Sequence, residues 1–255
     1  MLPAALIASY LAFPGAPCPH AEPVAPDSPR WLLEGAASVT DYLGRRSIRL
    51  DGGGATLKDL ALRDGVIDVD VATPASRGFF GIQFRISADG NNGEWVYLRQ
   101  HKSGLPDALQ YTPVLATGLN WQIYNGPGFT GSMEIPRGAW FHLRLELTGA
   151  QARLYADDMR TPVLVMPDLK SGIEKGQIAL AVLQGETYFS NFTVRETPPV
   201  AWERRPPPMP AGTLTQWRLS PSFDALTRDL ERPLPASETK RCGGRRWRPK
   251  RPGSW

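Results

Sequence analysis

Apolar and polar residues alternate along most of the chain between Trp31 and Val194, and this period-two pattern restricts the possible folds more than any other feature. Clusters rich in Gly, Asn and Asp, such as Asp51–Gly54 and Asp89–Gly93, separate the alternating stretches. The alternation is typical of antiparallel strands that bury one face, and many short strands joined by frequent turns are typical of a sandwich or barrel. No alternation of strands with helices is present, which excludes the doubly wound folds. We therefore predict an all-β, two-sheet antiparallel sandwich over residues 28–196.

Four stretches predict the direction of individual side chains: residues 66–71, 79–86, 95–101 and 140–147. Successive side chains of a strand point to opposite faces, so each stretch has an apolar face and a polar face. The residues predicted to face the core are Ile67, Val69, Val71, Phe80, Ile82, Phe84, Ile86, Val96, Leu98, Phe141, Leu143, Leu145 and Leu147. The residues predicted to face outward are Asp68, Asp70, Gln83, Arg85, Trp95, Tyr97, Arg99, His101, His142, Arg144 and Glu146.

The formal net charge of +4 comes from the C-terminal end of the chain. Seven basic residues and no acidic residue follow Glu238: Lys240, Arg241, Arg245, Arg246, Arg248, Lys250 and Arg251. Without them, 22 basic residues stand against 25 acidic ones, a net charge of −3. A mildly acidic body does not attract a polyanion, so we expect no nucleic acid partner.

The two ends differ in character from the middle region. Residues 1–21 combine an apolar stretch with small and Pro-rich residues, which predicts a signal peptide and a secreted or periplasmic location. Because no positive charge precedes the apolar stretch, a buried N-terminal segment is the alternative. Residues 197–255 are predicted to be a Pro-rich linker, a short helix around Phe223–Leu230 and a basic disordered tail, or else a truncated second domain. Beyond the N-terminus, no apolar run is long enough to cross a bilayer.

The sequence predicts no metal site and no cofactor. Cys18 and Cys242 lie outside the predicted sandwich, and the chain has no CxxC motif and 3 His residues, which disfavours a zinc site. The segment Asp89–Gly93 is similar to a calcium loop, but such Asx and Gly clusters ordinarily form hairpin turns.

Several local matches relate the middle region to a known superfamily. The matching segments are 64–71, 76–85, 97–113, 121–124, 140–146, 176–180 and 188–192. Together they resemble the concanavalin A-like lectin/glucanase superfamily in its laminin G-like branch, and within it bacterial domains labelled 3-keto-disaccharide hydrolase. The resemblance implies a jelly-roll sandwich that contacts a disaccharide or polysaccharide through one concave sheet face.

Hydrolases of that superfamily use a strand motif E-x-D-x-x-E, which this sequence lacks. The nearest analogue is Asp68 with Asp70, which share one strand face about 6–7 Å apart. This separation is compatible with paired-carboxylate hydrolysis, so the two are candidate catalytic residues. The alternative is that they are solvent-facing acids on a strand.

Candidate substrate-binding residues concentrate between residues 97 and 121. Sugar hydroxyls require hydrogen-bond donors and acceptors, and the apolar face of a sugar ring packs on an aromatic side chain. The candidates are Gln83, Arg85, Tyr97, Arg99, His101, Asp107, Gln110, Tyr111 and Trp121, with Tyr124 as a further platform. In the alternative interpretation, Arg99 and Asp107 form an ion pair that pins a loop and the aromatic residues cover a sheet edge.

Three functions are consistent with these observations. The first is an exported carbohydrate-binding module. The second is a glycoside hydrolase acting on a 3-keto-disaccharide or a glucoside, and the third is a laminin G-like domain that binds protein. The sequence leaves open whether the protein is an enzyme, and it predicts no oligomeric state.

Overall fold

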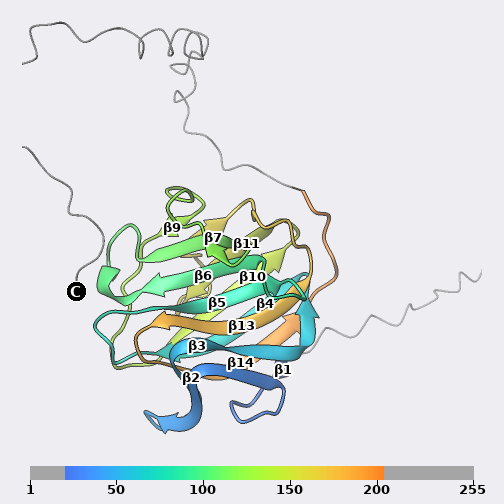
Figure 1. The fold of residues 1–255 in the computed structure, drawn as a ribbon. Coiled ribbons are helices and arrows are strands. Elements are labelled where there is room, and N and C mark those ends of the chain that lie inside the picture. The colour runs from blue at the N-terminus through green and yellow to red at the C-terminus, as the bar shows by residue number, and fades with distance from the viewer. Residues whose placement is uncertain (1–20, 204–255) are drawn as a thin grey trace, which may run out of the picture. The chain divides into compact units, whose positions relative to one another are not determined.

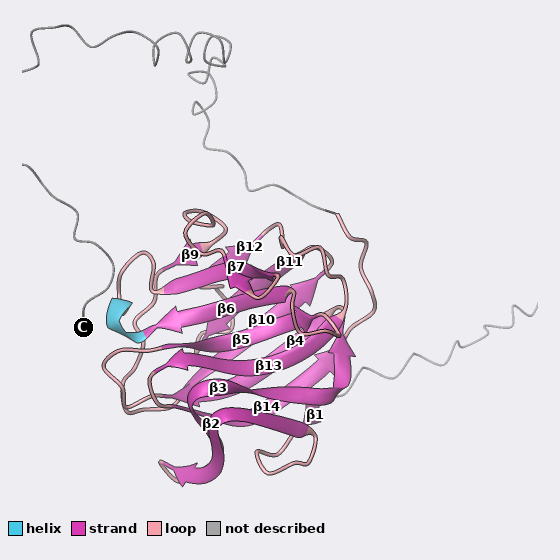
Figure 2. Cartoon of the chain, in the orientation of Figure 1, coloured by secondary structure: helices cyan, strands magenta, loops and turns pink. Residues whose placement is uncertain are grey.

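The computed structural model describes residues 21–203, which form an almost entirely β structure (Figures 1 and 2). The predicted short helix, the basic tail and all but the last residue of the predicted signal peptide lie outside the described residues. The elements are β1 (Glu22–Pro23), β2 (Trp31–Tyr42), β3 (Arg45–Leu62), β4 (Gly65–Ala72), β5 (Phe79–Ile86), β6 (Gly93–Arg99), the 3-10 helix η1 (Gln100–Lys102), β7 (Leu109–Leu115), β8 (Gly118–Leu119), β9 (Thr130–Gly131), β10 (Phe141–Thr148), β11 (Gln151–Ala156), β12 (Leu164–Met166), β13 (Gly176–Gln184) and β14 (Thr187–Glu196).

The strands form two layers, and the pairings between these named strands are antiparallel. One layer has the order β12-β11-β10-β4-β14, and the other has the order β13-β5-β6-β7-β8. The long strand β3 joins them, because Ile48–Leu50 pairs with β14 while Gly53–Leu57 pairs with β13. In Figure 1, β13, β5, β6 and β7 lie in front of β14, β4 and β10. The predicted two-sheet antiparallel sandwich is confirmed.

Glycine permits the passage of β3 between the layers. Gly53 has φ of +99°, and a Cβ atom there would lie 2.2 Å from the carbonyl oxygen of Glu34 on the paired strand β2. A side chain cannot occupy that position. Both the backbone conformation and the close neighbour therefore require glycine where β3 bends.

The apolar strand faces predicted from the sequence form the core between the layers. Those now buried are Ile67, Val69, Val71, Phe80, Ile82, Phe84, Val96, Leu98, Phe141, Leu143, Leu145 and Leu147. On β10 the four apolar side chains are buried while His142, Arg144 and Glu146 stay partly exposed. Burial of those four apolar side chains contributes about 6–12 kcal/mol before the entropy of chain ordering.

The end of β5 departs from the predicted alternation. Phe84 and Arg85 both lie opposite Ile178 of β13, which is a β-bulge, and Arg85 has φ of +50°. An extra residue in one strand reverses the direction of the side chains that follow it. The Arg85 side chain is therefore fully buried and Ile86 is partly exposed, so the outward Arg85 and inward Ile86 predicted from the sequence are wrong.

Residues 197–203, which the sequence assigns to a linker, pack over Arg85 at one end of the sandwich. The Arg85 guanidinium donates hydrogen bonds to Oδ1 of Asp64 at 3.2 Å and to two backbone carbonyl oxygens. Oδ2 of Asp64 accepts a hydrogen bond from the backbone N–H of Val200 at 2.7 Å. The Trp202 ring lies over the Arg85 guanidinium at 4.7 Å. The packed chain thus extends beyond Glu196 and covers a buried ion pair.

The segment Asp89–Gly93 joins β5 to β6 as a hairpin turn. The Asp89 carboxylate accepts hydrogen bonds from Oγ of Ser87 at 2.5 Å, from the backbone N–H of Asn91 at 3.1 Å and from its Nδ2 at 2.9 Å. These bonds are typical of an Asx turn. Within residues 21–203, no cluster of three His, Cys, Asp or Glu side chains is placed to hold a metal ion. Over the same range, no helix has the length and apolar character needed to cross a membrane.

Candidate functional site

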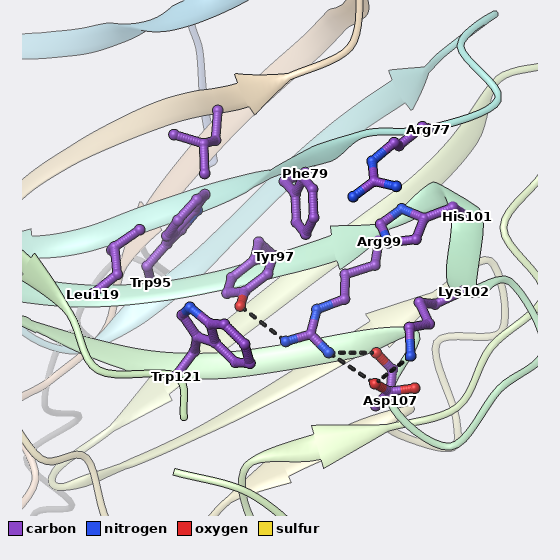
Figure 3. Close-up of a pocket in the computed structure, with 11 residues that line it drawn as sticks. Arg77, Phe79, Trp95, Tyr97, Arg99, His101, Lys102, Asp107, Leu119 and Trp121 are labelled. Carbon is purple, nitrogen blue, oxygen red and sulfur yellow. Dashed lines mark hydrogen bonds and ion pairs between the residues drawn. The ribbon is translucent and has the colours of Figure 1, made fainter. Parts of the chain in front are cut away.

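A cavity of about 380 Å³ opens on the outward face of the layer that contains β5, β6 and β13 (Figure 3). Its volume lies within the usual range for small-molecule sites. The lining residues are Arg77, Phe79, Trp95, Tyr97, Arg99, His101, Lys102, Asp107, Leu119, Trp121 and Leu183.

The alternation of side-chain directions along β6 determines which residues form the floor of the cavity. Val96 and Leu98 point into the core, so Trp95, Tyr97 and Arg99 point outward. The Trp95 and Tyr97 rings lie 4.4 Å apart between centroids and pack with buried Ala181 of β13 in a second apolar cluster. This outward sheet face is therefore apolar and aromatic at its centre.

The residues next to Tyr97 across the sheet have small side chains or none. Tyr97 pairs with Gly81 of β5, and Gly81 pairs with Ala181 of β13, so two residues without bulk stand next to one large ring on the same face. A Cβ atom on Gly81 would lie 2.1 Å from the carbonyl oxygen of Val96. The close approach of β5 and β6 thus requires glycine at this position.

Arg99 is held rigidly at the centre of the cavity. Its guanidinium donates hydrogen bonds to Oδ2 of Asp107 at 2.9 Å, to the Tyr97 hydroxyl at 3.1 Å and to Oε1 of Gln110. The guanidinium also lies over the Trp121 ring at 5.5 Å and over the Tyr97 ring at 5.4 Å. The Arg99–Asp107 ion pair considered from the sequence is present, and it also lines the cavity (Figure 3).

Gln110 connects this arginine to the segment that carries Trp121. While its Oε1 accepts from Arg99, its Nε2 donates to the backbone carbonyl oxygens of Tyr124 at 2.5 Å and Trp121 at 3.3 Å. Gln110 is almost fully buried below the cavity, so its bonds are shielded from water. Gln110 therefore fixes the position of Trp121 relative to Arg99.

Asp107 is a carboxylate that binds two cations through the same oxygen. Burial alone would raise its pKa, but the hydrogen bond from Lys102 and the charges of Lys102 and Arg99 hold that pKa below its usual value. Lys102 Nζ lies 3.1 Å from Oδ2 of Asp107, the oxygen that also binds Arg99. Neither cation contacts Oδ1, which leaves that oxygen available to accept a bond from a ligand hydroxyl.

The environment of His101 favours the neutral form of its ring. Burial lowers its pKa below 6.5, and the positive charges of Arg77, Lys102 and Arg99 lower it further. Its ring packs edge-on against Phe79 with centroids 5.0 Å apart. His101 therefore contributes an uncharged ring to the cavity wall.

The structure brings five of the nine predicted binding residues to the cavity: Tyr97, Arg99, His101, Asp107 and Trp121. Gln110 lies beneath them, and Gln83 lies opposite Trp95 on the same sheet face but outside the cavity. Arg85 and Tyr111 do not reach this face, which corrects two of the predicted positions. Tyr111 is buried opposite Val96 in β7, and its hydroxyl donates to buried Glu94 at 2.7 Å.

Several lining residues were not predicted from the sequence: Arg77, Phe79, Trp95, Lys102, Leu119 and Leu183. The sequence could have identified Trp95 and Phe79, because each alternates with the core residues of its own strand and is therefore expected on the outward face. Arg77, Lys102 and Leu119 reach the cavity from connecting segments or a short strand, and periodicity gives no information there.

Asp68 and Asp70 lie on β4, on the outward face of the other layer. His142 bridges them, with Nδ1 at 2.6 Å from Oδ1 of Asp70 and Nε2 at 2.9 Å from Oδ1 of Asp68. Asp68 also accepts from Nε of Arg144 at 2.7 Å, and Asp70 accepts from Nδ2 of Asn191 at 2.7 Å.

This network keeps both aspartates ionised. Burial would raise their pKa values, but the hydrogen bonds from His142 and from the other partners lower the pKa of each. Hydrogen bonds to Asp68 and Asp70 in turn raise the pKa of His142 to about 9. The general acid of paired-carboxyl glycoside hydrolysis has a raised pKa, whereas the pKa values of Asp68 and Asp70 are both lowered. The two aspartates and His142 form a hydrogen-bonded network on the face opposite the cavity.

Comparisons with known proteins establish the fold class. No protein-family model matches the sequence, and no curated protein matches it. Among solved structures, the carbohydrate-binding module CBM66 from Bacillus subtilis is similar, with a TM-score of 0.52, 19% identity, 66% of this chain covered and 96% of that one. A β-glucanase from Bacillus licheniformis matches with a TM-score of 0.47, 10% identity, 70% of this chain and 98% of that one.

The chain therefore shares the β-sandwich fold of this module, in agreement with the fold that the sequence resemblance implied.

Proposed function

We propose that the protein is a carbohydrate-binding module and that the cavity beside Trp121 holds a sugar ring. One observation carries the proposal: an aromatic ring, 44% exposed, stands beside a hydrogen-bonding pair that the protein has already fixed in place. A sugar offers an apolar C–H face and a rim of hydroxyls, and these two features of the cavity match them.

Each polar group at the cavity has a defined role in this proposal. Oδ1 of Asp107 accepts a hydrogen bond from a hydroxyl, and Lys102 donates one. Arg99 is a positioning residue, since its donors already bind Tyr97, Gln110 and Asp107. Because this arrangement exists before the ligand arrives, little side-chain entropy is lost on binding.

The cavity supports binding rather than cleavage. Asp107 is the one carboxylate among its lining residues within the described chain. Glycosidases of the usual kind place two carboxyl groups about 5–9.5 Å apart across the bond that is broken. The hydrolase interpretation of the resemblance would need a second acid in this cavity. We further propose that the module acts outside the cytoplasm, on the basis of the apolar stretch in residues 1–21.

A glycan array followed by calorimetry tests the proposal, with Trp121→Ala as the test variant and Trp140→Ala as a matched control. Trp140 is also a partly exposed tryptophan, but it packs on Tyr42 and Arg45 away from the cavity. We expect Trp121→Ala to lower glycan affinity by about tenfold or more, since an aromatic platform contributes about 1–3 kcal/mol, and Trp140→Ala to leave it unchanged.

Equal affinity of Trp121→Ala and the wild type for every bound glycan would refute the assignment of the site. Release of sugar from a disaccharide panel would instead favour the hydrolase interpretation. Failure to retain any glycan, together with specific retention of an extracellular protein, would favour the laminin G-like alternative.

A further inference from the structure

The cavity carries more positive than negative charge. Its lining, within the described chain, includes three cationic side chains, Arg77, Arg99 and Lys102, against the single carboxylate of Asp107. Arg99 and Lys102 both contact the same Oδ2 atom of Asp107, at 2.9 Å and 3.1 Å. The available negative charge is thus already shared by two cations, and none remains for Arg77.

Arg77 stands at the end of the cavity away from Trp121. It is exposed on the segment before β5, and within residues 21–203 its guanidinium has neither an ion pair nor a hydrogen bond. In Figure 3 the guanidinium points toward the cavity beside Phe79 and His101, while Trp121 lies on the far side of Arg99.

The effect of this charge on a neighbouring group is visible at His101. After burial, the positive charge of Arg77 is the next largest cause of the lowered pKa of His101. The charge of Asp107 raises the pKa of His101 by less than each of the three cations lowers it, so the net potential at the imidazole is positive. The same positive potential would attract an anion at this end of the cavity.

We propose that the sugar recognised by this cavity carries an acidic group, a carboxylate or a sulfate, and that Arg77 binds this group while the ring packs on Trp121. The inference rests on the proposed function and specifies its ligand class. A guanidinium suits either anion because it presents two parallel N–H donors. Outside the seven basic C-terminal residues the chain has a net charge of −3, so the positive field is local and fits a short acidic oligosaccharide better than a long polyanion.

The test uses ligands that differ in charge and share a skeleton. An α-1,4-linked galacturonic acid trisaccharide, its fully methyl-esterified form and a sulfated galactose oligosaccharide are titrated by calorimetry, after an array of paired acidic and neutral glycans has ranked skeletons. We expect the acidic member of a pair to bind more tightly than the neutral one. Arg77→Gln should lower that affinity about three- to tenfold and leave the neutral member within about twofold.

Arg153→Gln is the matched control, because Arg153 is an exposed arginine on β11 of the other layer. The acid and sulfate arms show which anion Arg77 accepts. The assignment to Arg77 would be overturned if Arg77→Gln still binds the acidic glycan more tightly than the neutral one. It would also be overturned if Arg153→Gln loses this difference in affinity to the same extent as Arg77→Gln.

The two proposals fail in different ways. If the wild type binds neutral glycans in a Trp121-dependent manner with no preference for their acidic counterparts, the charge inference is overturned and the proposed function stands. If it binds neither class, both are overturned. Higher affinity for the acidic member in the wild type and in Arg153→Gln, reduced to the neutral level in Arg77→Gln, is the result expected.

Discussion

A chain that ends at Glu196 should be markedly less stable than one that ends at Glu203. The shorter chain lacks the backbone N–H of Val200, which donates to the buried Asp64 carboxylate at 2.7 Å, and the Trp202 ring, which lies 4.7 Å over the Arg85 guanidinium. Asp64 and Arg85 have side chains that are 0% exposed, so truncation uncovers an ion pair that the fold otherwise shields.

The expected loss of stability follows from these two contacts. A hydrogen bond to a charged group contributes about 1.5–3 kcal/mol, and a partly desolvated cation–π contact contributes about 0.5–2 kcal/mol. Water replaces part of the lost hydrogen bonding once the pair is uncovered, so we expect a net loss of about 2–4 kcal/mol. At about 2–4 °C for each kcal/mol in a domain of this size, the melting temperature should fall by about 4–16 °C.

Calorimetric melting of the two chains, with Trp202→Ala in the longer chain as a third sample, measures this effect. Trp202→Ala should account for roughly a third to a half of the loss, because it removes the ring and keeps the Val200 hydrogen bond. Melting temperatures within about 2 °C of each other for the chains ending at Glu196 and Glu203 would refute the reasoning. In that case Glu196 would be the true boundary of the packed sandwich.

Three further predictions concern other parts of the molecule. His142 has a folded pKa of about 9 against an ordinary 6.5, so its stabilising charge is fully present below pH 6.5 and is lost as the pH rises through about 9. Urea denaturation measures the free energy of unfolding at pH 6 and at pH 10. Between these pH values the wild type should lose about 1–2 kcal/mol more of it than His142→Gln, after allowance for screening of a partly exposed group. Equal losses in the two proteins would contradict this prediction. Gln110→Leu removes the acceptor for Arg99 and the donor to Trp121, so glycan affinity should fall about tenfold while the melting temperature, the control, falls by only a few degrees. Gly81→Ala places Cβ 2.1 Å from a backbone oxygen and should lower the free energy of unfolding by more than about 3 kcal/mol. The control Gly138→Ala, whose Cβ meets no atom within 4 Å, should lower it by about 1–2 kcal/mol. Similar melting temperatures for the two variants would show that β5 and β6 separate easily.

The alternation of the sequence determined which strand faces form the core. In β10 the side chains of Phe141, Leu143, Leu145 and Leu147 are buried as predicted, because the direction of a side chain in a regular strand depends only on its position. For the same reason Tyr97 and Arg99 share the outward face of β6 with Trp95. The two-layer antiparallel architecture could be predicted from this local property.

Local alternation could also have separated two residues that were predicted together. Gln110 and Tyr111 are neighbours in β7, so a strand must point them to opposite faces, and the structure buries Tyr111 on the core side while Gln110 lies under the cavity. The position of Arg85 could not have been predicted in this way, since a bulge opposite Ile178 reverses the phase.

The tertiary structure alone decided where the cavity beside Trp121 lies and what charge it has. Both layers expose polar side chains, but Asp68 and Asp70 on β4 meet His142 of a neighbouring strand and become a closed ion network. On the other layer, Arg77 from the segment before β5 and Lys102 from η1 line the same cavity as Trp121. Their proximity depends on strand order and on the path of the loops, which are set by the packing of the whole sandwich and not by the residues near each of them in sequence.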